Sequence, residues 1–234
     1  MTAGDRDRTG HSGLVNRPWD AAAGLSQGSG RSAPSRPGPI LSSPMSDTTS
    51  PLQLDVQANR SARKYTRREM AMRVLWIPGQ YLLRLSPRPL FGWRRWVLRL
   101  FGAEIGPHVH VHNSTRVTMP WNLRVGAWAA IGEDTLIYNL GPVDIGERAT
   151  ISHRAHLCAG SHDYRRADLP LTKPPISIGS QSWICAEAFV GPGVTVGEGA
   201  VVGAGSVAMK DVPAWAVVTG NPAEVVSQRR LSDD

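Results

Sequence analysis

His162 is the residue whose type and surroundings best suit chemistry, and it lies in the segment Gly-Ser-His-Asp-Tyr at 160–164. The pKa of a free imidazole is about 6.5, so histidine can take up a proton near neutral pH. The stretch from about 162 to 176 contains three prolines and predicts a loop. We interpret His162 as a candidate general base at the root of this loop. A surface histidine without a catalytic role is the alternative.

Three further histidines, His108, His110 and His112, alternate along one predicted strand in a pattern that could suggest a metal site. We interpret them as a solvated or subunit-contact stripe, and we expect no metal. The chain has only two cysteines, Cys158 and Cys185. They fall on different sides of the architecture derived below and lack an evident base nearby. We therefore expect neither a disulfide nor a cysteine nucleophile.

The elements that must position His162 follow from a repeat of six residues. Aliphatic residues recur at Ile178, Ile184, Val190, Val196 and Val202. A small residue or valine follows each of them by four positions, at Ser182, Ala188, Val194, Ala200 and Ser206. This period is typical of a hexapeptide β-helix, in which three hexads make one turn of a triangular prism and both recurring positions face its core. Glycines at 179, 197 and 203 would permit tight corners.

The repeat begins earlier in the chain and predicts five turns, an all-β fold. The inward positions group in threes as 105/111/117, 125/131/137, 145/151/157, 178/184/190 and 196/202/208. Every insertion falls after the third hexad, so all extra residues leave the prism at the same corner. In this register Ser161 points inward and His162 points outward at the root of the longest insertion.

The segments outside the repeat complete the predicted organisation. Residues 1–56 are rich in Gly, Ser and Pro and predict a disordered extension, within which Met45 is an alternative start. Residues 57–104 predict a basic helical cap with helices at about 66–77 and 90–101, separated by Pro78 and the Ser-Pro-Arg-Pro run. The β-helix occupies 105–212, and Pro213 is expected to stop its ladder. Residues 213–234 predict a turn and a short helix from Ala223 to Leu231.

The formal charge of +7 is unevenly placed. Between Arg60 and Phe101 eleven basic residues face one acidic residue, Glu69, so this flank alone carries +10. A charge confined to one flank argues against nucleic-acid binding. It leaves two compatible interpretations: a cap over an open β-helix end, or a membrane-surface helix pair with Trp76, Trp93 and Trp96 at the interface. No membrane span or signal peptide is evident, so we expect a cytoplasmic protein, with peripheral contact at the inner membrane face under the second interpretation.

The block from Leu157 to Arg230 joins the Gly-Ser-His-Asp-Tyr segment to Ser-Trp-Ile at 182–184 and Gly-Asn-Pro-Ala at 220–223. It resembles the hexapeptide-repeat O-acetyltransferases, in particular the colanic-acid-biosynthesis type, which is similar to the nodulation and galactoside acetyltransferases. Residues 98–106 and 119–123 match that group as well. The resemblance implies a left-handed parallel β-helix, a homotrimer with active sites between neighbours, acetyl-CoA as donor and a saccharide hydroxyl as acceptor, in exopolysaccharide or cell-surface glycan biosynthesis.

The resemblance also implies roles for single residues. His162 falls on the catalytic histidine, Trp183 on the aromatic residue that lines the site, and Ala186 on a backbone N–H at the thioester end. The remaining coenzyme contacts fall on Ala204, Met209 and Lys210. Asp163 would be one candidate to orient the imidazole.

Two departures from the family pattern concern the ends of the site. Ser227 stands where relatives carry a basic residue for the nucleotide end of the coenzyme, and Arg229 or Arg230 is a candidate substitute. Tyr138 and Asn139 stand where the galactoside enzymes contact their sugar, so the acceptor is open.

Two other functions stay open on the same fold. Carbonic anhydrases with a β-helix hold zinc between subunits with three histidines, for which His153, His156 and His162 are candidates. His156 and His162 are one residue further apart than the usual pair of that family. The third alternative is a non-catalytic β-helix scaffold, which would not bind coenzyme A.

Overall fold

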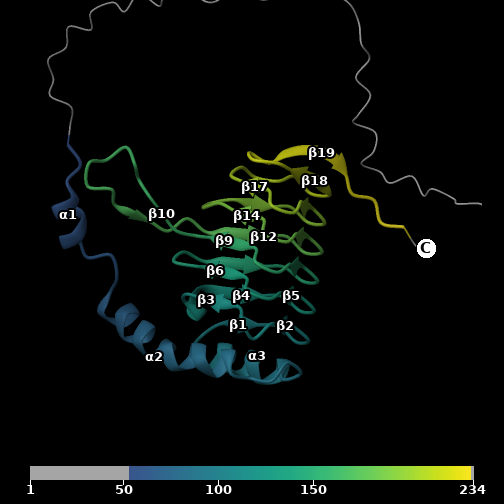
Figure 1. Cartoon of the computed structure of the whole chain (residues 1–234), viewed down its shortest axis with the longest axis horizontal. Helices are drawn as coiled ribbons and strands as arrows, with labels where there is room; N and C mark the ends of the chain where they lie inside the picture. The colour runs from purple at the N-terminus through teal and green to yellow at the C-terminus, as the bar shows by residue number, and fades with distance from the viewer. Residues whose placement is uncertain (1–52, 233–234) are drawn as a thin grey trace, which may run out of the picture. The chain divides into compact units, whose positions relative to one another are not determined.

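The computed structural model describes residues 53–232, and the expectations for the extension before residue 53, including Met45, lie outside this part. The described chain starts with three helices: α1 (Val56–Ser61), α2 (Arg67–Arg84) and α3 (Phe91–Leu100). It continues into a stack of short strands, with α2 and α3 lying across one end of the stack (Figure 1). The architecture is therefore a parallel β-helix, as the six-residue period predicts, and it is the left-handed form that the resemblance implies.

Three sheets of mainly parallel strands form the sides of the prism. Side one contains β1 (Glu104–Ile105), β4 (Leu123–Val125), β7 (Val143–Ile145), β12 (Ile176–Ile178) and β15 (Thr195–Val196). Side two contains β2 (His110–Val111), β5 (Ala130–Ile131), β8 (Thr150–Ile151), β13 (Trp183–Ile184), β16 (Val201–Val202), β18 (Ala216–Thr219) and β19 (Glu224–Gln228). Side three contains β3 (Arg116–Val117), β6 (Leu136–Tyr138), β9 (His156–Cys158), β14 (Phe189–Val190) and β17 (Val207–Ala208).

The predicted register is confirmed by the strand pairs. Ile178 pairs with Val196 on side one, and Ile184 pairs with Val202 on side two. The small positions are also buried, with Ser182, Ala188, Val194, Ala200 and Ser206 each at most 2% exposed. Side chains of one hexad position therefore stack on each other along the prism, and burial of each aliphatic one contributes about 1.5–3 kcal/mol.

The predicted turn count and C-terminal helix are wrong. The ladder continues past Pro213, because Val212 bridges Val196 and β18 pairs with β16, which gives about six turns. Residues expected to form a helix form the antiparallel hairpin of β18 and β19 instead. Proline cannot donate a hydrogen bond, but Pro213 lies in a corner between two strands, where the ladder needs no donor from it.

The longest insertion leaves the corner between sides three and one. It carries the two-stranded ribbon of β10 (Ser161–His162) and β11 (Leu171–Thr172), which pairs His162 with Leu171. Ser161 is exposed, contrary to the predicted inward position, because the chain has already left the prism there. A 3-10 turn at Pro120–Asn122 (η2) occupies the same corner two coils earlier in the sequence.

The helical cap differs from prediction in one respect, because α2 runs through Pro78 as a single helix. A proline inside a helix costs roughly 3 kcal/mol. Pro78 is on the exposed side, while Trp76, Gly79 and Leu83 are buried against the rest of the protein. Tertiary packing of this buried face offsets the local cost. The helix predicted at 90–101 agrees closely with α3.

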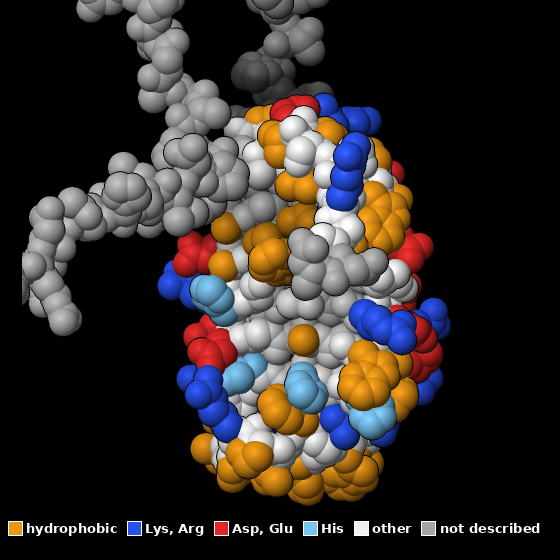
Figure 2. Space-filling view, turned by 90° about the vertical axis from the view of Figure 1, so that its right-hand side faces the viewer, with side chains coloured by type: hydrophobic (Ala, Val, Ile, Leu, Met, Phe, Trp, Pro, Cys, Tyr) orange, Lys and Arg blue, Asp and Glu red, His pale blue; other side chains and the backbone are white. Residues whose placement is uncertain are grey.

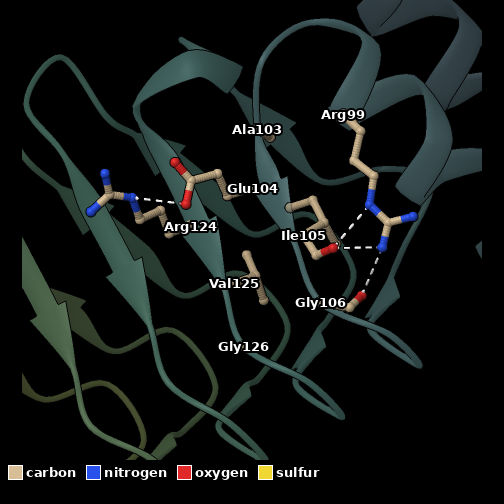
Figure 3. A pocket seen from close by; sticks show the side chains of 8 residues that line it. All are labelled: Arg99, Ala103, Glu104, Ile105, Gly106, Arg124, Val125 and Gly126. Atoms are coloured by element: carbon tan, nitrogen blue, oxygen red, sulfur yellow. Dashed lines mark hydrogen bonds and ion pairs between the residues drawn. The ribbon is translucent and has the colours of Figure 1, made fainter.

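The cap closes the open edge of all three sides with side-chain donors. On side one, Arg99 Nε donates to Ile105 O at 2.9 Å (Figure 3). The hollow of about 490 Å³ beside it is lined by residues of this capped edge. Side two is capped by Arg94 Nε, which donates to Val111 O at 2.6 Å, and by Arg95 Nη1, which donates to Val109 O at 2.9 Å.

Side three is capped by the other helix. Trp76 Nε1 donates to Val117 O at 2.7 Å, and Gln80 Nε2 donates to Thr115 O at 3.0 Å. Trp76 is 4% exposed, so it does not belong to a surface tryptophan set as the membrane interpretation assumed. The arginines of α3 and this tryptophan therefore act as a cap.

Two of the corner glycines, Gly179 and Gly197, are needed because the backbone of the next coil lies close to them, and not because of their own φ angles. A Cβ on Gly179 would lie 2.5 Å from the backbone nitrogen of Glu198 in the next coil. Left-handed φ angles occur two residues further on, at Gln181 and Gly199. Glycine at 179 thus lets consecutive coils stack at the normal strand spacing.

Candidate active site

His162 is held by a hydrogen bond from its ring to the far arm of the loop. Its Nδ1 lies 2.6 Å from the carbonyl oxygen of Leu169. A carbonyl can only accept, so Nδ1 carries the proton and a neutral ring keeps its lone pair on Nε2. The side chain is exposed, which leaves Nε2 accessible. This is the tautomer that a general base requires.

The acceptor of that bond is itself fixed by α1. Leu169 adopts a φ of 42°, in the left-handed region that residues with a Cβ rarely occupy. Its carbonyl oxygen also accepts a hydrogen bond from Asn59 Nδ2 at 2.7 Å. Asn59 donates to Asp168 O at 2.7 Å as well, and Lys64 Nζ holds the Asn59 oxygen at 2.8 Å. A short helix at the start of the described chain thus orients the histidine through the loop.

Asp163, considered as a partner of the imidazole, has a different role. Its carboxylate accepts a hydrogen bond from the backbone N–H of Arg165 at 3.1 Å, which closes a local turn. Its own N–H donates to Pro170 O at 3.0 Å and continues the ribbon. The orienting acceptor of His162 is therefore a backbone carbonyl, which sequence inspection could not single out.

Four predicted site residues besides His162 lie at the corner between sides three and one. Tyr138 ends β6, and Met209 and Lys210 follow β17. All three are exposed. Asn139 is at the same corner, but it is fully buried and serves the fold. Its Oδ1 accepts from the Met119 N–H at 2.9 Å and its Nδ2 donates to Met119 O at 2.6 Å, so the assignment of Asn139 to substrate binding is wrong.

The other predicted residues lie on side two and at the corner between sides two and three. Trp183 is 45% exposed on β13, and its Nε1 donates to Ser152 Oγ at 2.8 Å. Ala186 and Ala204 occupy equivalent turns in consecutive coils. The Ala186 carbonyl accepts from Gly205 N at 2.9 Å, whereas its N–H donates to no residue among 53–232. That N–H is therefore a candidate donor to a ligand.

The residues near His162 and the turns of Ala186 and Ala204 are separated by the width of side three. His162, Met209 and Lys210 are at one edge of this sheet, and Ala186 and Ala204 are at the other. One chain therefore does not bring the histidine together with the turn of Ala186. A second copy placed with its other edge against the loop would supply the missing half.

The two arginines considered for the nucleotide end of the coenzyme differ in their contacts. Arg229 Nη1 donates to Gln181 O at 2.7 Å and to Gly199 O at 3.1 Å, so it ties the C-terminal segment to the corner between sides one and two. Arg230 is exposed and makes no hydrogen bond or ion pair within 53–232. Ser227 lies on β19, opposite Val217.

The histidine sets do not gather into a metal site. His108 stacks on Trp128 with ring centroids 4.1 Å apart, and His110 stacks on Phe91 at 4.2 Å. His112 lies 3.0 Å from a carboxylate oxygen of Glu133. Within residues 53–232 there is no group of three or more His, Cys, Asp or Glu placed to bind one metal ion.

His153, His156 and His162 are likewise separated, at a corner, on a side and on the loop respectively. Burial lowers the pKa of His156 from its usual range, because burial disfavours the charged form of the imidazole. Both cysteines are free thiols whose pKa values burial raises. Thiols of that kind are poor nucleophiles.

The chain is 41% identical over 154 residues to the Escherichia coli K12 protein described as colanic acid biosynthesis acetyltransferase WcaF, covering 66% of this chain and 85% of that protein. The chain belongs to this acetyltransferase family. Nodulation protein L of Rhizobium leguminosarum bv. viciae is 37% identical over 134 residues, which cover 56% of this chain and 67% of that protein. No family model matches the chain.

Solved structures of acetyltransferases share the fold. A hexapeptide-repeat acetyltransferase from Vibrio cholerae superposes with a TM-score of 0.65 at 25% identity, covering 70% of this chain and 93% of that one. Another crystal structure of that Vibrio protein holds acetyl-CoA, with a TM-score of 0.65 at 24% identity over 71% of this chain and 91% of that one. The family membership makes this protein an acetyltransferase, and the loop histidine and the Ala186 turn are its candidate catalytic parts.

Proposed function

We propose that the protein transfers the acetyl group of acetyl-CoA to a hydroxyl of a saccharide, with His162 as the general base, in the synthesis of an exopolysaccharide or another cell-surface glycan. The observation that carries the proposal is the hydrogen bond from His162 Nδ1 to Leu169 O, which leaves Nε2 as the proton acceptor. The names of the colanic acid and nodulation relatives support a glycan acceptor.

The acetyl group can pass directly from the thioester to the sugar oxygen without a covalent enzyme intermediate. Nε2 of His162 takes the proton of the sugar hydroxyl while its oxygen bonds to the thioester carbonyl carbon. The N–H of Ala186 faces the oxygen that becomes negative, as in other acyl transfers. The carbon–sulfur bond then breaks, and the imidazolium returns the proton to the departing thiolate. General base assistance of this kind contributes about 10²–10⁴-fold in rate.

The acting unit is a homotrimer in this proposal. His162 and the turn of Ala186 are at opposite edges of side three, so a neighbouring copy is needed to complete each site. Met209 and Lys210 lie at the same edge of side three as His162 and would contact the coenzyme. Trp183 and Tyr138, both exposed, would border the acceptor.

The test is His162→Ala, compared with wild type in release of free thiol from acetyl-CoA and in mass gain of candidate saccharides. We expect kcat to fall about 10²–10⁴-fold while coenzyme affinity and oligomer mass stay the same. The matched control is His110→Ala, because His110 is also exposed but lies on side two near the cap. Turnover near wild type in His162→Ala would overturn the base assignment.

Asn59 is a positioning residue in the same proposal. Asn59→Ala removes one of the two hydrogen bonds to Leu169 O and frees the loop, so we expect kcat to fall with little change in KM for acetyl-CoA. Asn59→Asp likewise supplies no donor of its own to that carbonyl and should behave like alanine. A shift in the pH profile of kcat/KM separates this role from a merely structural one, because only a reoriented imidazole changes that profile.

A further inference from the structure

The helical cap has a second face that the prism does not use. Its inward side is buried, and its outward side carries apolar side chains that are between 39% and 80% exposed. We call this surface the outer face, and it consists of Met70, Val74, Leu75, Ile77, Tyr81, Leu82, Leu85, Trp93, Trp96 and Leu100. In Figure 2 hydrophobic side chains gather over the end of the molecule where these helices lie, at the bottom of the view.

The outer face is one continuous surface across both helices. Trp93 and Trp96 stack with ring centroids 5.1 Å apart. Trp93 Nε1 donates to Leu82 O at 3.2 Å and so fixes α3 against α2. On α2 the exposed positions fall at spacings of three and four residues, which places them on one stripe of the helix. Two charged residues lie between Met70 and Leu85: Arg73, which is half-buried over the ring of Tyr65, and Arg84, which is exposed.

Basic residues border this surface without acidic partners. Arg67 and Arg68 are exposed at the start of α2, and Arg84 is exposed at its end. None of the three makes an ion pair among residues 53–232. The acidic residue of this flank, Glu69, is paired with Lys173 at 3.4 Å and is only partly exposed. The fully exposed charged residues at the two ends of α2 are therefore all cationic.

We propose that the outer face rests on an anionic lipid surface. Apolar side chains with tryptophans, bordered by arginines, match the boundary between acyl chains and negatively charged head groups. Charge complementarity favours lipid over a second copy of the same face, because two such faces would oppose their arginines. No helix within residues 53–232 is long and apolar enough to cross a bilayer, so the contact is peripheral.

Arginines 94, 95 and 99 do not take part in this contact. Their guanidinium groups donate to carbonyls of the first coil, and Arg94 is fully buried. The cap and the membrane surface are thus two faces of the same helices. The capping face uses hydrogen-bond donors, and the outer face uses apolar area with a cationic border.

The experiment is co-sedimentation of the full chain with vesicles of phosphatidylcholine, with and without phosphatidylglycerol. Wild type is expected to bind the anionic vesicles and to be released by added salt, because salt screens charges beyond about 10 Å at 0.1 M. The variant Val74→Glu/Ile77→Glu/Leu85→Glu should lose this binding. The matched control changes Val225, Val226 and Leu231 to Glu, since these are similarly exposed at the opposite end of the chain.

A second variant, Arg67→Gln/Arg68→Gln/Arg84→Gln, isolates the cationic border. It is expected to lower the partition coefficient on anionic vesicles at least about tenfold, because each basic group near such a surface contributes measurably to binding. Melting temperature and oligomer mass should equal those of wild type in both variants, since none of these side chains is buried.

Three results would overturn the proposal. The first is equal binding of wild type to both kinds of vesicle. The second is unchanged binding of the glutamate variant, and the third is a lower oligomer mass of that variant in solution, which would assign the outer face to a second copy of the chain. Acetyl transfer to a soluble saccharide is measured in parallel, so failure of the proposed function is seen separately.

Discussion

The backbone groups of the first and last coils have no further coil to pair with, and the two ends of the β-helix satisfy them in different ways. At the first coil, backbone carbonyls of all three sides receive donors from side chains of α2 and α3. At the last coil the chain covers itself with its own backbone: Val212 on side one, β18 on side two, and the turn at 220–223 on side three, where Val207 N donates to Gly220 O.

The difference follows from which groups each end presents. Carbonyls need donors, and arginine, the tryptophan indole and the glutamine amide supply them at a distance from the helix backbone. A continuing strand supplies both donors and acceptors, so the C-terminal end needs no such residues. The first end therefore depends on a few specific side chains, whereas the second depends on the course of the chain.

The largest effect is expected for Arg94→Leu. Arg94 is fully buried and donates to Val111 O, Pro87 O, Arg88 O and Ser86 Oγ. Leucine would leave these acceptors without a donor, so we expect a loss of about 3–5 kcal/mol in the free energy of unfolding, measured by urea denaturation.

The control for that substitution is Arg84→Leu on the exposed side of α2, which should change stability by less than about 0.5 kcal/mol. Equal effects of the two substitutions would mean that the cap does not depend on its buried donors.

A smaller effect is expected at the other end from Val218→Ala. Val218 is 3% exposed in the sixth turn and pairs with Val202. Removing two methyl groups from a packed core should cost about 2 kcal/mol. Val225→Ala, at an exposed position of β19, is the control and should be neutral. If Val218→Ala were also neutral by thermal denaturation, the sixth turn would not belong to the cooperative core.

A single neutral donor of the cap should matter less. Gln80→Ala removes one hydrogen bond to Thr115 O and should lower the unfolding free energy by about 1 kcal/mol. Gln57→Ala on exposed α1 is its control. A loss comparable with that of Arg94→Leu would contradict the view that the charged, buried donor dominates the cap.

The smallest effect is a pH dependence from Glu69 at the start of α2. The hydrogen bond from the Thr66 backbone, above all, holds the pKa of Glu69 below its usual range. A carboxyl with a lowered folded pKa stabilises the protein above its unfolded pKa, about 4.3, and this contribution is lost as pH falls through the folded value. The difference in unfolding free energy between wild type and Glu69→Gln should therefore shrink as the pH falls from roughly 6 to roughly 3. A difference that stays constant with pH would exclude this cause.

The prism was predictable because its determinants are local and repeated. Each inward position, such as Ile178 or Ser182, reports its own burial through its residue type. The prediction that a helix ends before Pro78 is wrong, because Trp76 and Leu83 of that helix are buried against distant parts of the chain. The helix predicted at 223–231 is wrong because this segment pairs with β18 as a hairpin, a partner that sequence alone does not reveal.

Sequence could predict which side chains of the candidate site have a suitable residue type, but not which groups orient them. His162 has the residue type for its proposed role, but its orientation depends on Leu169 O, and any residue has a carbonyl. Asn59 is more than a hundred positions from Leu169 in the chain, so no spacing pattern connects them. Asn139 was assigned to the substrate because sequence alone does not tell that both polar atoms of its side chain bind Met119.

If the proposed function holds, the position of His162 along the prism has a consequence for which acceptors can reach it. β10 follows the third coil, two strand spacings of about 4.8 Å above the first coil. The helical layer adds about 10 Å. With the outer face on a bilayer, the imidazole would stand at a working height of roughly 20 Å above the lipid. A lipid-linked glycan shorter than this height would not reach the base. The thickness of the cap would therefore restrict the reaction to glycans already elongated beyond their first sugars.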